Sequence, residues 1–139
     1  MKTLIRIIII GSFIAFLNAC KKDNNGGNNQ ITGKWNIVKD STYVGVGTSN
    51  QLVVYNGQPG DYFDFRTNGN VYTKEGAVLD TLSYTVKTPG QIIISKFGIV
   101  SNGVPPVSSF LLTAHTASII APSFLTPGGQ FGREVNLTR

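Results

Sequence analysis

Hydrophobic and polar residues alternate with a period close to two along most of the chain after residue 30. Alternation places successive side chains on opposite faces of a β-strand, so it predicts strands that bury one face. No segment sustains an apolar stripe at helical spacing long enough to predict a helix. The pattern predicts nine strands, at residues 33–44, 51–55, 62–67, 70–74, 78–87, 91–96, 108–113, 117–121 and 132–139.

Segments rich in asparagine, proline and glycine separate these predicted strands. Such residues tolerate a positive φ or preset φ, as tight turns between antiparallel strands require. The predicted turns lie at residues 56–60, 68–70, 88–90, 102–106 and 126–129. The sequence therefore predicts strands that follow one another through hairpins.

The segment YFDFRTNGNVYTKEG is the clearest predicted hairpin. Phe63 and Phe65 share one face of its first strand, while Tyr62, Asp64 and Arg66 share the other. An Asn-Gly pair follows and reverses the chain into a partner strand. The aromatic pair is therefore expected to face inward.

Short antiparallel strands must protect their edges, and two architectures do so. One is a closed up-and-down barrel of about eight strands, and the other is a two-sheet β-sandwich. Residues 31–139 are enough for one such all-β domain with a single core. The alternation alone does not choose between the two.

The first 19 residues have the form of an export signal. Lys2 and Arg6 precede an apolar run at residues 7–17, and small residues precede Cys20. A membrane-spanning helix needs roughly 20 apolar residues, about twice the length of this run. The sequence thus predicts a cleaved signal peptide at residues 1–19.

Leu17, Ala19 and Cys20 resemble the lipobox of bacterial lipoproteins, with leucine three positions before the cysteine and a small residue directly before it. The resemblance implies that the Cys20 thiol carries diacylglycerol and that the new amine is acylated, for example with palmitate. Residues 20–30 are then expected to be the lipidated cysteine and a flexible polar tether to the membrane. An ordinary signal peptide with an incidental thiol stays open as the alternative.

The tether begins with Lys21-Lys22-Asp23, which is similar to the signals that send lipoproteins of the Bacteroidota to the outer face of the outer membrane. The expected location is therefore the cell envelope, lipid-anchored at the outer membrane. The periplasmic and the surface face both stay open.

The head of the domain, ITGKWNIVKDS, carries Gly33 and Trp35 in a pattern that resembles the Gly-x-Trp signature of lipocalins. Together with the FRTNGNVYT segment and the terminal Arg139, it is similar to the lipocalin-like domains of Bacteroidota lipoproteins. The resemblance implies a calycin-type barrel in which Arg139 packs across Trp35 at the closed end. The domain is shorter than a full lipocalin and lacks a predicted helix before its last strand.

The charge of the chain argues against a nucleic-acid partner. Of the net charge of +5, the predicted domain keeps eight basic against six acidic residues, a difference of +2. These basic residues are scattered singly, without the cluster that phosphate binding requires.

The sequence offers no catalytic or metal-binding set, so we expect a non-enzyme without a cofactor. His115 is the single histidine, expected in a turn or on the surface, and Cys20 is the single cysteine. Asp61 and Asp64 are three residues apart and would lie on opposite faces of a strand, which disfavours a glycosidase-like pair.

Two functions remain open. The first is a binding module for a small, hydrophobic ligand, lined by Phe63, Phe65 and Tyr84 on the inward face, although such residues are also ordinary core residues. The second is a filled barrel with a structural or protein-interaction role, for which residues 98–107 and 109–122 would supply an exposed apolar patch. The oligomeric state is not predicted.

Overall fold

The computed structural model of the chain describes residues 31–45, 51–126 and 129–139, and all regular elements in these ranges are β-strands. The strands are β1 (Gly33–Gly45), β2 (Gln51–Asn56), β3 (Tyr62–Phe65), β4 (Asn70–Glu75), β5 (Val78–Thr88), β6 (Gln91–Ile94), β7 (Val107–Leu112), β8 (Thr116–Thr126) and β9 (Gly129–Thr138). They match the nine predicted strands. The largest difference is at β8, which extends five residues beyond its predicted end. The described part of the chain contains no helix with the length and apolarity needed to cross a membrane.

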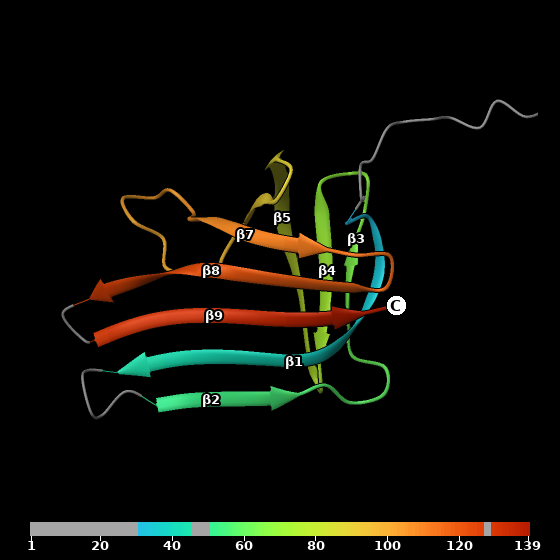
Figure 1. Cartoon of the computed structure of the whole chain (residues 1–139), viewed down its shortest axis with the longest axis horizontal. Helices are drawn as coiled ribbons and strands as arrows, with labels where there is room; N and C mark the ends of the chain where they lie inside the picture. The colour runs from blue at the N-terminus through green and yellow to red at the C-terminus, as the bar shows by residue number, and fades with distance from the viewer. Residues whose placement is uncertain (1–30, 46–50, 127–128) are drawn as a thin grey trace, which may run out of the picture.

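Eight of these strands close into an antiparallel up-and-down barrel. Each strand from β3 to β9 pairs with the next, and β1 pairs with both β3 and β9, which closes the ring. In Figure 1, β8, β9, β1 and β2 run side by side across the view, and β3, β4 and β5 cross behind them at a steep angle. The predicted barrel is confirmed, and the β1–β9 pairing excludes two separate sheets.

The remaining strand, β2, lies outside the ring because β1 divides one of its edges between two partners. Residues 33–36 of β1 pair with β3, and residues 39–44 pair with β2. The Gly57 N–H donates to the Val38 carbonyl (3.1 Å), and a Cβ on Gly57 would lie 1.9 Å from the Ile37 carbonyl oxygen. Only glycine fits this approach, which turns the chain from β2 into β3.

The barrel interior is filled by alternate side chains of the closing strands. The buried hydrophobic residues form one contiguous cluster, and its largest members are Trp35, Phe63, Phe65 and Phe97. Phe97 comes from the segment between β6 and β7, so a connection as well as the strands contributes to the core.

The β3–β4 hairpin has the predicted turn. Gly69 adopts a φ of +80°, and the Asn68 side-chain oxygen accepts from the Asn70 N–H at 3.0 Å. This turn sets the register in which Phe65 faces Val71 and Asp64 faces Tyr72. The hairpin therefore presents an apolar face to the core and a polar and aromatic face to the outside.

Candidate functional site

The end of β9 lies beside the start of β1, where the sequence predicts the contact between Trp35 and Arg139. We call this end of the barrel the Trp35 end. The Arg139 guanidinium carbon lies 4.1 Å from the centre of the Trp35 ring, and its Nε donates to the Ala114 carbonyl at 3.1 Å. Trp35 is fully buried and donates its indole N–H to the Ile31 carbonyl. Gly33 lies beside the same guanidinium. The expected cation–π contact is present, so Arg139 is not simply a solvated terminus.

The three residues predicted to line a ligand cavity lie together in this end of the barrel. Phe63 and Phe65 are fully buried with ring centres 6.2 Å apart, and Tyr84 meets Phe65 edge to face at 5.1 Å. The Tyr84 hydroxyl donates to the Arg66 carbonyl at 2.9 Å. These side chains occupy the interior as packed core residues.

An ion-pair cluster lies on the inner side of the barrel farther along β1 and β9. Arg133 pairs with Asp40 through Nε and Nη2, and the same Nη2 lies 3.0 Å from Glu75. The ring of Phe97 covers the guanidinium at 4.8 Å. Burial raises the pKa of Glu75, and the Arg133 charge partly offsets this effect.

A second carboxylate holds the end of β2 to the barrel. Asp61 accepts hydrogen bonds from the Tyr55 hydroxyl and from the backbone N–H groups of Gln58 (2.8 Å) and Gly76 (2.9 Å). These bonds, above all that from Tyr55, lower the pKa of Asp61, and the same bond raises the pKa of Tyr55. Asp61 therefore joins β2 to the turn between β4 and β5.

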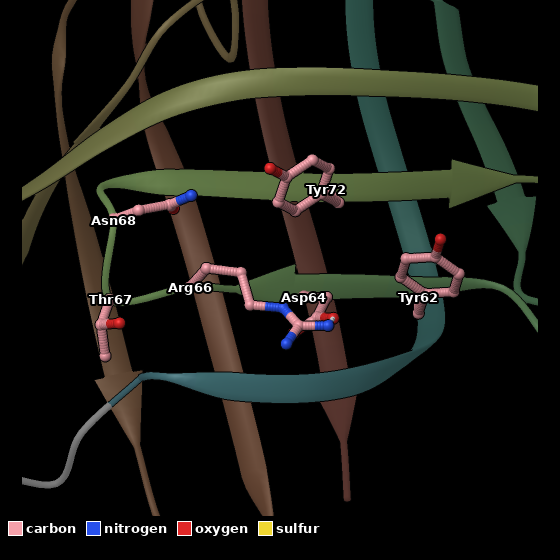
Figure 2. A pocket seen from close by; sticks show the side chains of 6 residues that line it. All are labelled: Tyr62, Asp64, Arg66, Thr67, Asn68 and Tyr72. Atoms are coloured by element: carbon pink, nitrogen blue, oxygen red, sulfur yellow. Dashed lines mark ion pairs between the residues drawn. The ribbon is translucent and has the colours of Figure 1, made fainter.

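A groove runs over the outer face of the β3–β4 hairpin. It has a volume of about 520 Å³ and is lined by Tyr62, Asp64, Arg66, Thr67, Asn68 and Tyr72. Figure 2 shows Arg66 bending back toward Asp64, with the tyrosine rings on the neighbouring strands. Arg66 Nη2 lies 2.6 Å from the Asp64 carboxylate, which is almost buried, whereas the Arg66 side chain is 61% exposed.

A smaller pocket adjoins this groove toward the start of β1. Its volume is about 380 Å³, and its lining includes Thr32, Gly33 and Lys34. It shares Asp64, Arg66 and Thr67 with the larger groove, so the ion pair stands between the two. Lys34 Nζ lies 4.2 Å above the Tyr62 ring. We call the two pockets together the outer groove.

No family model, curated protein or solved structure matches the chain. The role of the outer groove must therefore be argued from its own chemistry. That chemistry is two tyrosine rings around a carboxylate and a guanidinium, with a hydroxyl and an amide at the rim.

The other sequence predictions have separate outcomes. Cys20, the predicted signal at residues 1–19 and the tether at 20–30 lie outside the described residues. His115 is exposed between β7 and β8, as expected. Asp61 accepts from the Gln58 N–H in the loop between β2 and β3, whereas Asp64 pairs with Arg66 on the outer face of β3. Within the described ranges, no group of three or more His, Cys, Asp and Glu could hold a metal ion.

The sequence pattern predicts part of the lining of the outer groove but does not mark it as a groove. The period of two put Tyr62, Asp64 and Arg66 on one face, opposite the two phenylalanines. The alternation does not predict that Tyr72 joins this face, because Tyr72 lies opposite Asp64 only through the register of the hairpin. The sequence signal that could have indicated this groove is an outward aromatic residue on each of two paired strands.

Proposed function

We propose that this protein is a lipid-anchored, non-catalytic binding module of the bacterial cell envelope, with a lipocalin-like barrel as its scaffold. In this proposal Cys20 carries the lipid and residues 21–30 tether the domain at the outer membrane. The ligand binds in the outer groove instead of between Phe63, Phe65 and Tyr84.

The support for anchoring is the order of segments in the chain. A basic leader, a short apolar run, a lipobox-like end and a polar segment follow one another within the first 30 residues. Several acyl chains at about 0.8 kcal/mol per buried methylene give stable attachment, whereas one chain is marginal.

The observation that carries the binding proposal is the contrast between the two faces of β3. Inward, Phe63 and Phe65 pack against other core residues and are fully buried. Outward, Tyr62, Asp64 and Arg66 line a hollow whose volume lies in the range of small-molecule sites, about 300–1,000 Å³. A small ligand thus has room on the outer wall.

The anchor is tested by labelling cells with a clickable palmitate and fractionating membranes. Wild-type protein should label and sediment with the membrane, and Cys20→Ser should do neither. Binding is tested by native mass spectrometry of the full chain released from detergent micelles. A small molecule retained by the wild type and lost from Tyr72→Ala would support the outer groove, whereas one retained by Tyr72→Ala and lost from Phe65→Leu would favour the interior.

The exposed strand β2 favours a second function, a structural or protein-interaction role. β2 pairs only with β1 among the described strands, and Leu52, Val53 and Val54 are 50%, 59% and 41% exposed. Exposed apolar edges of this kind pair readily with another strand. Elution as a monomer that Val53→Lys does not change would argue against this role.

A further inference from the structure

We infer that the outer groove binds a neutral saccharide, with Tyr62 and Tyr72 contacting its apolar ring faces and Asp64 and Arg66 contacting its hydroxyls. This inference rests on the proposed function, because it names the ligand class of the groove proposed there. It is carried by the Asp64–Arg66 ion pair, by two tyrosines and by the continuity of the two pockets.

The Asp64–Arg66 pair in the middle of the outer groove disfavours an ionic ligand at that point. Arg66 is paired with Asp64 at 2.6 Å, so an anion would have to compete with Asp64 for the guanidinium. A cation would have to displace Arg66 from Asp64 and would also meet Lys34, which lies over the Tyr62 ring. A neutral ligand avoids both costs and leaves the ion pair intact.

The intact pair can still accept hydrogen bonds from a ligand through Asp64 and donate hydrogen bonds to it through Arg66. A carboxylate has about four acceptor sites and a guanidinium five N–H donors, and one contact between them uses a small part of this capacity. A hydroxyl can donate to Asp64 and accept from Arg66. Thr67 and Asn68 add a hydroxyl and an amide at the rim of the same groove. A polyol is the neutral ligand class that uses all of these groups.

The two tyrosines supply the apolar contact that a sugar ring needs. Tyr72 stands opposite Asp64 on β4 and is 37% exposed, and Tyr62 lies two residues from Asp64 on the same face of β3. A tyrosine joins an apolar ring to a polar hydroxyl, so it can contact C–H groups and hydroxyls of one ligand. A fatty acid, in contrast, would leave the Asp64–Arg66 pair beside a chain that cannot bond to it.

The size of the outer groove favours more than one sugar unit. The pockets of about 520 and 380 Å³ share Asp64, Arg66 and Thr67, so they are adjacent sites along one wall. A chain of linked units can lie across both and contact the ion pair in the middle. We therefore expect a disaccharide or longer glycan to bind more tightly than a single sugar.

The test is a glycan array of neutral and charged saccharides probed with the full chain, followed by titration calorimetry on the best neutral glycan. We expect a neutral oligosaccharide to bind, and Tyr72→Ala to weaken it about tenfold, the effect of losing one aromatic contact of about 1.4 kcal/mol. Asp64→Asn should weaken binding as well, because an amide offers fewer acceptors in the same volume.

Tyr43→Ala is the matched control, since Tyr43 is a tyrosine of similar exposure (40%) on β1, nine residues beyond Lys34 and outside the groove lining. It should bind like the wild type. Absence of binding to every neutral glycan, or stronger binding of charged ones, would overturn the saccharide class. If a ligand of a different chemical class binds, and Tyr72→Ala and Asp64→Asn weaken that binding, the saccharide inference is wrong but the proposed function stands. Binding that Tyr72→Ala and Asp64→Asn leave unchanged would overturn both.

Discussion

The Trp35 end of the barrel and the strand β2 both contain large hydrophobic residues, but these residues differ in burial. At the Trp35 end, Trp35 and Phe65 are fully buried. In β2, three consecutive aliphatic residues remain about half exposed, because the strand has no second strand partner in the described chain. Ring strands also carry exposed apolar residues, such as Leu79 of β5 (69%) and Leu111 of β7 (71%). Burial in this molecule therefore requires a side chain that faces the barrel interior as well as a strand that joins the ring.

The first prediction tests the packed end and has the largest effect. Phe65→Ala should lower the free energy of unfolding by about 3–5 kcal/mol, because Phe65 is fully buried against Phe63 and Tyr84 and the space would not refill. Urea unfolding followed by the fluorescence of Trp35, the single tryptophan, measures it. A loss below about 1 kcal/mol would contradict the packed interior.

The second prediction concerns Arg133, whose ion pair with Asp40 joins β9 to β1. Arg133→Met should cost about 3 kcal/mol, the low end for breaking a buried ion pair, because it leaves Asp40 buried without its partner. Burial already raises the pKa of Glu75, and the loss of Arg133 should raise it further. The deficit should shrink as the pH falls through the raised pKa of Glu75, because that carboxyl then takes up a proton and no longer needs the Arg133 charge. A deficit independent of pH would contradict this account.

The third prediction concerns the bond that pins β2 to the barrel. Tyr55→Phe removes the hydroxyl that does most to lower the pKa of Asp61. A lowered carboxyl pKa stabilises the fold above the unfolded value of 3.8, and this contribution disappears as the pH falls through the folded pKa. The raised pKa of Tyr55 stabilises the fold below 10.0 and is lost as the pH rises through its folded value.

Unfolding of Tyr55→Phe should therefore differ most from that of the wild type between about pH 5 and 9, and the difference should vanish toward both extremes. Urea titrations across this range measure it. Asp61→Asn serves as the comparison, because it removes the same pH dependence from the acid side. Parallel stability curves of wild type and Tyr55→Phe would show that the bond is not formed in solution.

The fourth prediction concerns the cation–π contact between Arg139 and Trp35. Arg139→Gln should lower stability by about 1 kcal/mol, the usual contribution of a cation over an indole. It should also shift the Trp35 emission, since the cation lies 4.1 Å from the ring centre. Arg139→Lys should recover part of both effects, and an unchanged emission in Arg139→Gln would contradict the contact.

Most of the fold could be predicted because its determinants are local. Alternation marks the strands, and turn residues such as Asn68 and Gly69 mark the hairpins over a few positions. The position of β2 outside the ring was not predictable from local sequence patterns. It depends on the approach of Gly57 to Ile37, residues that are far apart in sequence and that meet only after β1 has paired. The same holds for the outer groove, since Tyr72 reaches Asp64 only in the folded register.

The fifth prediction has the smallest effect and sharpens the comparison from the exposed side. Val53→Lys should change the free energy of unfolding by less than about 0.5 kcal/mol, because the side chain is 59% exposed and lies on a strand outside the ring. A lysine on a free edge also opposes pairing with another strand, so the variant should associate less at high concentration. Size-exclusion chromatography and urea unfolding measure both properties. A loss comparable to that of Phe65→Ala would mean that β2 is packed in solution as tightly as the Trp35 end.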